Sequence, residues 1–260
     1  MKALSKYAEL KRKGVDTVRF IITENYDDMS IKAAQETAKF LIEMPNLVLG
    51  LSTGGTPIGT YKKLIKLHEQ EGLDFSGVTT FNLDEYVGLD PFHIQSYHRY
   101  TWDNFLSHVN IKEENVHIPP GVFQNPRQVL KEYDDKLAAA GGIDVQILGI
   151  GGNGHIGFNE PSEVLHAHTH VANLTEETIQ DNARFFTHEQ EVPKQAIAMG
   201  VGDILKAKHI ILIASGEEKA EAIKHTFSSR ITTAWPSSLL QLHPSLTIVI
   251  DRDAAKFLTQ

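Results

Sequence analysis

Short apolar runs alternate with amphipathic segments along the chain, and this alternation limits the folds that the chain can adopt. Each run has the length and composition of a buried β-strand, and most of the stretches between them have helical periodicity. Strands that alternate with helices form βαβ units around a mostly parallel sheet, with helices on both faces. The pattern therefore predicts an α/β fold. The runs are TVRFII, NLVLGLS, VTTFNLDEY, IDVQILGI, HIILIAS and SLTIVID.

Two segments carry the clearest helix signals. In residues 57–71, PIGTYKKLIKLHEQE, the apolar side chains share one face and Thr56 stands at the N-cap position. A second helix is predicted over residues 216–227. Ser215 precedes it and Glu218 follows three residues later, which is the spacing of a capping box. Both helices directly follow an apolar run, as βαβ units require.

The length of the chain, 260 residues, suits one α/β domain spanning 1–260 better than two domains. Residues 161–195 break the alternation with a polar stretch rich in His, Thr, Glu and Asn, and we expect this segment to form a lid. Residues 1–16 precede the first strand and are predicted to be an N-terminal extension.

Composition and charge exclude several classes of function. The formal net charge of −8 argues against a nucleic-acid partner, because binding to a phosphate backbone relies on clustered Lys and Arg. The absence of cysteine excludes disulfides, thiolate nucleophiles and cysteine-ligated metals. No stretch reaches the roughly 18 apolar residues of a spanning helix, and the N-terminus lacks the apolar core of a signal peptide. We therefore expect a cytoplasmic protein without a membrane partner.

Two predicted strands end in polar residues. LGLSTGGTP, residues 49–57, opens onto the first predicted helix, and free N–H groups at such a helix start favour phosphate; a tight strand-to-helix turn is the alternative. FNLDEYVGL, residues 81–89, places Asp84 and Glu85 at a strand end. Ligands of open α/β sheets collect at this edge, so an acid there is placed to act as a base, although most such pairs are only solvated.

The run IDVQIL leads directly into GIGGNGHIGFNEP, residues 149–161, which contains five glycines. Its first, second and fourth glycines match the G-x-G-x-x-G pattern of dinucleotide sites, but a polar stretch closed by proline follows in place of an apolar helix. The dinucleotide interpretation therefore fails. Glycines also allow backbone to pass close to a smaller ligand, with His155 and Glu160 reaching the same position.

Cations and clustered histidines are the remaining candidates. Arg184 and Lys219 suit phosphate recognition, with ordinary surface roles as the alternative. His166, His168 and His170 would share one face of a strand, which suits zinc. No carboxylate or fourth ligand is evident beside them in the sequence, so no metal site is predicted.

Taken together, these stretches resemble the glucosamine/galactosamine-6-phosphate isomerase family. The resemblance implies a Rossmann-like sheet with a mobile lid, and the deaminase reaction of amino-sugar catabolism. In that reaction glucosamine 6-phosphate and water give fructose 6-phosphate and ammonia, and no cofactor is needed. The resemblance runs from about Arg19 to Asp253 through LGLSTGGTPIGTYKKL, FNLDEYVGL, SYHRY, GIGGNGHIGFNEP, NARFF and VPKQAIAMGVGDIL.

The resemblance also implies a role for each candidate. Asp84 matches the base that moves a proton between C2 and C1, and His155 matches the residue that assists ring opening. Glu160 matches the carboxylate that orients His155. Asn153 stands where some members have Asp and others Asn, and it is expected to hydrogen-bond the imidazole. The residues implied for the substrate phosphate are Thr53, Gly54, Gly55, Thr56, Arg184 and Lys219.

Two other functions are compatible with the same motifs. A 6-phosphogluconolactonase has a similar glycine loop without the FNEP ending, and a noncatalytic sugar-phosphate sensor uses a related fold. The chain lacks a basic DNA-reading helix, which argues against the sensor. A glucosamine and a galactosamine substrate are not separated. The short stretch after SLTIVID favours a monomer, with a homo-oligomer left open.

Overall fold

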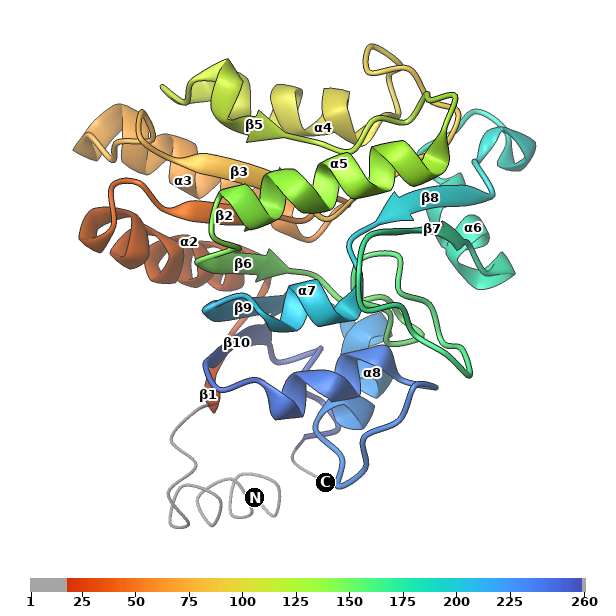
Figure 1. The fold of residues 1–260 in the computed structure, drawn as a ribbon. Helices are drawn as coiled ribbons and strands as arrows, with labels where there is room; N and C mark the ends of the chain where they lie inside the picture. Colours follow the sequence, from red (N-terminus) through yellow and green to blue (C-terminus); the bar gives the residue numbers. More distant parts are fainter. Residues whose placement is uncertain (1–17, 259–260) are drawn as a thin grey trace.

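The computed structural model describes residues 18–258, so the N-terminal extension predicted at 1–16 lies outside the described residues. The main sheet has seven strands in the order β1-β10-β9-β6-β2-β3-β5, and all neighbours are parallel (Figure 1). This confirms the predicted α/β fold. The strands are β1 (Val18–Thr23), β2 (Val48–Leu51), β3 (Thr79–Asn82), β5 (Val116–His117), β6 (Val145–Leu148), β9 (His209–Ala214) and β10 (Leu246–Asp251).

Helices connect most of these strands. Within residues 18–258, no helix combines the length and the apolar character that crossing a membrane requires. The α-helices are α2 (Tyr26–Glu43), α3 (Pro57–Glu71), α4 (Tyr97–Asn104), α5 (Pro126–Ala139), α6 (Glu176–Ala183), α7 (Val201–Leu205) and α8 (Ala220–Thr226). The 3₁₀ helices are η1 (Leu106–His108), η2 (Glu113–Asn115), η3 (Glu189–Glu191), η4 (Glu217–Lys219) and η5 (Pro236–Leu242).

The central strands are buried on both faces. Successive side chains of a strand point to opposite sides of the sheet, so each strand contributes to two separate cores. In β10, Leu246, Ile248 and Ile250 enter one core and Val249 enters the other. The first core includes side chains of α5, α7 and α8, and the second includes side chains of α2 and α3. Helices therefore cover both faces, as predicted (Figure 1).

The prediction of a single strand over residues 78–86 is wrong, because these residues are divided between two sheets. β3 belongs to the main sheet, whereas β4 (Asp84–Tyr86) lies in a small antiparallel sheet with β8 (Gln195–Ala198) and β7 (His170–Asn173). The chain changes sheets at Leu83. Its N–H still donates to the Leu51 carbonyl beside β3, while its own carbonyl accepts from Met199 after β8. The small sheet could not be predicted from the local pattern.

The two predicted helices are present, but neither has the side-chain cap expected at its first turn. α3 matches its predicted range and ends at Gly72, whose φ of 73° lets its N–H donate to the last-turn carbonyls. Thr56 occupies the N-cap position, but its side chain makes no capping hydrogen bond. The helix predicted over 216–227 is present as η4 followed by α8.

The capping box predicted at the start of this second helix is wrong. The Ser215 hydroxyl donates to the Asp251 carboxylate at 2.5 Å, and the same carboxylate accepts the Gly216 N–H. Asp251 is the last residue of β10, next to β9 in the sheet. A carboxylate from the neighbouring strand therefore fixes this loop in place of a local cap.

The strand order reverses between β2 and β6. After β2 the chain moves outward through β3 and β5, and after β6 it moves in the other direction through β9 and β10. The loops that leave the carboxyl ends of β2 and β6 therefore diverge and open a crevice at this edge of the sheet. Ligand sites of open α/β sheets form at such reversals.

Candidate active site

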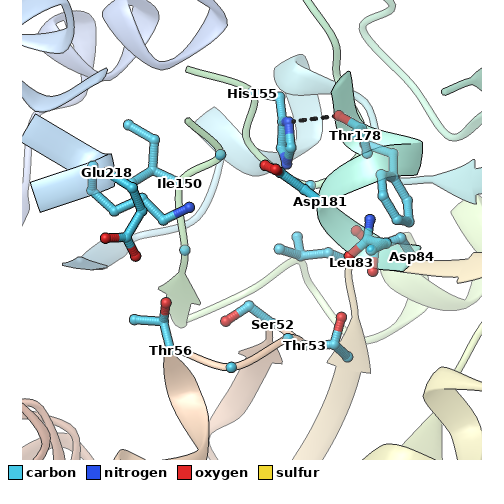
Figure 2. A pocket seen from close by; sticks show the side chains of 18 of the residues that line it. Ser52, Thr53, Thr56, Leu83, Asp84, Ile150, His155, Thr178, Asp181 and Glu218 are labelled. Carbon is cyan, nitrogen blue, oxygen red and sulfur yellow. Dashed lines mark hydrogen bonds between the residues drawn. The ribbon is translucent and has the colours of Figure 1, made fainter. Parts of the chain in front are cut away.

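A cavity of about 360 Å³ lies at this reversal point. Its walls come from the loops after β2, β6 and β9, from β4 and from α6. Figure 2 shows Ser52, Thr53 and Thr56 on one side of the cavity and His155 and Thr178 on the other. Segments that are far apart in the sequence thus meet around one space of a size that suits a small ligand.

The loop after β2, residues 52–56, presents its backbone to the cavity. Tyrosine hydroxyls hold its carbonyl groups from outside: Tyr61 donates to Ser52 at 2.6 Å, and Tyr100 donates to Gly54 at 2.7 Å. Among the described residues, the N–H groups of Thr53, Gly54 and Gly55 have no hydrogen-bond partner. Unpaired N–H groups directly before the start of α3 form an anion-binding arrangement.

His155 is held from behind the cavity. Its Nδ1 donates to the Asn153 side-chain oxygen at 2.9 Å and lies 3.4 Å from Glu160 Oε2 and 3.5 Å from the Thr178 hydroxyl. The Asn153 amide in turn donates to Glu160 at 2.9 Å. The other ring nitrogen, Nε2, faces the centre of the cavity (Figure 2). A proton can therefore be exchanged with a ligand at Nε2.

Glu160 is buried, and burial alone would raise the pKa of its carboxyl. The hydrogen bond and charge of His155, together with Thr178 and Asn153, outweigh this effect and hold the pKa of Glu160 below its ordinary value. The carboxylate is therefore ionised at neutral pH. It lies 3.4 Å from Nδ1 of His155.

Close packing around the His155 ring explains the glycines of this loop. A Cβ atom on Gly151 would lie 2.3 Å from the ring. Gly154 has a φ of 82°, and a Cβ there would meet the Trp235 ring at 2.5 Å. Only residues without a side chain fit these two positions. The loop thus brings backbone against the catalytic candidate itself as well as towards a ligand.

Asp84 also lines the cavity and is the first residue of β4. The residue is 5% exposed, and its Oδ1 has no hydrogen-bond partner in the described part of the chain. Burial and the adjacent Glu85 raise its pKa to about 8, although the nearby Thr53 hydroxyl and Phe158 N–H oppose the rise. A carboxyl with such a pKa takes up and releases a proton near neutral pH.

Two cations and two further acids complete the lining. Arg184 and Lys219 both line the cavity, and neither forms an ion pair with any residue in 18–258. Burial lowers the pKa of Lys219, while Glu218 and Asp181 oppose this effect. α6 and its C-cap contribute Thr178, Asp181 and Arg184 at three-residue intervals, so one helix face lines the cavity.

The structure brings most of the predicted site residues together. Asn153 and Glu160 do not line the cavity and stand behind His155 instead. Asp181 and Glu218 also line the cavity, although the sequence did not indicate them. The Ser215–Gly216 turn lines it as well, and its place at the end of the run HIILIA could have indicated this. The predicted residues that line the cavity are Thr53, Gly54, Gly55, Thr56, Asp84, His155, Arg184 and Lys219.

The three alternating histidines do not share a strand face, because only His170 lies in β7. The His166 and His170 rings stack with centroids 4.3 Å apart. His168 meets two carboxylates that the sequence did not indicate, since ligand atoms of Asp134, His168 and Asp203 lie within 4.8 Å of one another. Asp203 also pairs with the Lys206 ammonium at 2.9 Å. This cluster is separate from the cavity lining.

Comparisons with known sequences point to one family. The family described as glucosamine-6-phosphate isomerases/6-phosphogluconolactonase matches residues 24–248. A glucosamine-6-phosphate deaminase of Thermoanaerobacter pseudethanolicus is 54% identical over 241 residues, which cover 93% of this chain and 95% of that protein. A glucosamine-6-phosphate deaminase of Clostridium perfringens is 49% identical, with 93% of this chain and 100% of that protein covered.

Comparisons with solved structures separate two groups. A monomeric glucosamine-6-phosphate deaminase superimposes with a TM-score of 0.90 at 44% identity, covering 92% of this chain and 99% of that chain. A 6-phosphogluconolactonase from Trypanosoma cruzi has a TM-score of 0.75 at 19% identity, covering 94% and 98%. The likeness to the second group extends to the fold alone.

Proposed function

The chain belongs to the glucosamine-6-phosphate isomerase/6-phosphogluconolactonase family, and we propose that it converts glucosamine 6-phosphate and water to fructose 6-phosphate and ammonia. It is thus an enzyme of amino-sugar catabolism. Relatives at 48–54% identity that bear the name glucosamine-6-phosphate deaminase support this reaction.

One observation carries the proposal. A buried acid, an imidazole and an anion-binding loop, all from distant parts of the sequence, line the same cavity. The lining includes cations as well as the carboxylates of Asp84, Asp181 and Glu218. An aminosugar phosphate carries a phosphate at one end and an ammonium group near the other, so a cavity with both signs of charge complements it.

The phosphate is proposed to bind between the loop at 53–56 and the side chains of Arg184 and Lys219. The loop offers unpaired N–H groups, Arg184 a bidentate fork and Lys219 a point charge. Binding the phosphate, which does not react, supplies energy that orients the reacting end of the sugar.

Ring opening comes first, because the cyclic sugar has no carbonyl group. A proton must leave the anomeric hydroxyl and another must reach the ring oxygen. His155 is proposed to move this proton through Nε2, since its Nδ1 is held by Asn153 and faces Glu160. Glu160 and Asn153 are positioning residues in this scheme, because they act through the imidazole.

Asp84 is proposed to carry out the isomerisation. Its carboxylate removes the proton from C2, the C2–H electron pair forms a C1=C2 double bond, and the C1 oxygen takes up the proton that the ammonium group of the substrate releases. The protonated Asp84 then returns the proton to C1, which leaves a C=N bond at C2. Water adds to C2, and ammonia leaves. Positioned acid–base groups of this kind contribute about 100-fold to 10,000-fold each.

Two alternatives are less well supported. Lactone hydrolysis would follow from the 6-phosphogluconolactonase structures, but the identity to them is 16–21%, against 44–54% for the deaminases quoted above. A noncatalytic sensor does not need a buried acid with a raised pKa in the same cavity as an oriented imidazole.

The test is to supply the purified protein with glucosamine 6-phosphate and to measure ammonia and fructose 6-phosphate in coupled assays. Stoichiometric formation of both is the expected result. Hydrolysis of 6-phosphogluconolactone without ammonia from the aminosugar would support the lactonase, and binding without turnover would support the sensor. Comparing kcat/KM for glucosamine and galactosamine 6-phosphate identifies the preferred substrate.

The oligomeric state is proposed to be a monomer. The structural relative at 44% identity is described as monomeric, and its fold superimposes over 92% of this chain. Light scattering coupled to gel filtration should give a mass near 29 kDa. A mass of a multiple of this value would contradict the proposal.

A further inference from the structure

Glu85 is a buried carboxyl that the proposed reaction does not use. It follows Asp84 in β4, is 1% exposed and does not line the cavity. Burial of a carboxyl in an apolar environment is costly unless the group is neutral or well hydrogen-bonded. The burial of Glu85 therefore needs an explanation, either in the stability of the fold or in the chemistry of Asp84.

The contacts of Glu85 are all with backbone N–H groups. Oε1 accepts from Tyr86 at 2.8 Å and from Tyr97 at 2.9 Å, and Oε2 accepts from His98 at 2.8 Å. Tyr97 and His98 are the first two residues of α4, so the carboxylate sits at the positive end of that helix. These contacts stabilise the ionised form and fix its position one residue after Asp84 in β4.

We propose that Glu85 is a positioning residue for proton transfer: α4 holds its negative charge beside Asp84, and this charge sets the pH at which Asp84 exchanges its proton. The inference rests on the proposed function, in which Asp84 is the base. It adds a reason for two adjacent acids at this strand end. One acid reacts, and the other tunes it.

The other groups that face Asp84 leave Glu85 as the dominant neighbouring charge. Opposite the two acids, β8 presents Ala198 and Ile197. The loop after β2 contributes the Thr53 hydroxyl, and the loop after β6 contributes the Phe158 N–H. Tyrosines whose pKa values are raised by burial, and which are therefore neutral, surround the acid; they are Tyr61, Tyr86, Tyr97 and Tyr133.

Arg184, Lys219, Asp181 and Glu218 line the same cavity as Asp84, but none of them is among the groups that shift its pKa. Other charged groups have partners of their own. His155, across the cavity, pairs with Glu160. On α4, the Arg99 guanidinium bonds to Asp103 at 2.5 Å. Burial lowers the pKa of His98, so its imidazole is neutral at pH 7. In the described residues no cation forms an ion pair with Asp84 or Glu85.

The pKa values of the two acids agree with this arrangement. Burial raises the pKa of Glu85 to about 7, with the Tyr97, His98 and Tyr86 N–H groups opposing the rise. Burial raises the pKa of Asp84 to about 8, and the charge of Glu85 is the second cause. The charge of Glu85 thus makes Asp84 a stronger base. A base with a pKa near the working pH transfers protons efficiently.

The experiment compares Glu85→Gln with Ser96→Ala across pH. Ser96 caps α4, since its hydroxyl accepts the Arg99 N–H at 3.0 Å, so its loss loosens the same helix start without removing a charge. For Glu85→Gln, the acid limb of kcat/KM is expected to move down by about one pH unit, with kcat reduced roughly three- to tenfold. For Ser96→Ala, the limb should stay in place.

An unmoved acid limb in Glu85→Gln, or an equal movement in Ser96→Ala, would overturn the inference. If Glu85→Gln does not fold, Glu85→Asp replaces it. That variant keeps the charge but shortens its reach to α4, so the limb should remain near its wild-type pH, and a downward move would count against the role of the charge.

A second readout does not depend on turnover. The free energy of unfolding of Asp84→Asn relative to its parent reports the titration of Asp84, and this titration should move to lower pH in a Glu85→Gln parent. Failure of the proposed function would appear as wild-type protein that forms no ammonia. Failure of this inference alone would appear as active wild type with an unmoved Asp84 titration.

Discussion

Replacing Asp84 by asparagine is expected to stabilise the protein while abolishing its activity. The pKa of this carboxyl is about 8 in the folded chain against an ordinary value of 3.8, because the group is buried next to another acid. Asparagine has nearly the same shape and no charge. Its amide oxygen can accept from Thr53 and Phe158, the two donors that face the carboxylate.

The sign of the effect follows from proton linkage. Between pH 3.8 and about 8 the unfolded chain has released the Asp84 proton while the folded chain retains it, so stability falls as pH rises. The slope approaches about 1.4 kcal/mol per pH unit, which gives roughly 4 kcal/mol at pH 7 as an upper bound. Local relaxation and water entry reduce such values, so we expect a gain of about 2–3 kcal/mol for Asp84→Asn at pH 7.

The assay is urea unfolding of wild type and Asp84→Asn at several pH values from 4 to 8. The gain should be small near pH 4 and should increase as pH rises. Glu36→Gln serves as a control of opposite sign. Burial alone would raise the pKa of Glu36, but Lys39 and Arg19 outweigh it and lower the value, so this variant should be less stable at neutral pH and should lose its deficit as pH falls.

A pH-independent gain, or a loss of stability at pH 8, would refute the account of Asp84 as a destabilised acid. Ammonia formation by Asp84→Asn should drop by at least about 100-fold, with little change in the binding of an unreactive sugar phosphate. Substantial retained turnover would remove Asp84 from proton transfer, whatever the stability measurements give.

Other changes test the remaining parts of the site. Arg184→Ala should raise KM by about 10-fold to 100-fold, since a charge-assisted hydrogen bond contributes about 1.5–3 kcal/mol; Arg252→Ala, at an exposed ion pair, should leave KM unchanged. His155→Gln should lower kcat by about 100-fold or more. The variant should still bind an acyclic hexitol 6-phosphate, and loss of that binding would show that His155 acts in substrate binding instead. Gly151→Ala should lower kcat by displacing the His155 ring, whereas Gly149→Ala, where a Cβ would have no neighbour within 4 Å, should be tolerated; equal effects would rule out the steric argument. A metal chelator should leave turnover intact, and activity that is lost with chelator and restored by zinc would contradict the proposed acid–base chemistry.

The sequence was most informative where function depends on position along a strand. Asp84 and the loop at 53–56 were predicted from their places at strand ends, because the carboxyl ends of parallel strands share one edge. His155 was singled out by the density of glycines around it. In the structure, the Gly151 position explains that density through contact with the ring.

Partners that come from distant parts of the chain could not be predicted in this way. Ser215 has the local spacing of a helix cap, yet it bonds to Asp251, which lies 36 residues further along. His168 similarly meets Asp134 and Asp203 only through the tertiary fold. The antiparallel pairing of β4 with β8 was missed for the same reason, since periodicity describes a strand without identifying its neighbour.

The placement of Thr178 and Arg184 on one short helix has a consequence for how substrates are discriminated. If the phosphate binds Arg184 as proposed, it also restrains α6, and with it the Thr178 hydroxyl next to Nδ1 of His155. The two ends of the sugar are then mechanically linked through about two helical turns. An aminosugar without the phosphate should accordingly have a lower kcat, even at concentrations that saturate the cavity.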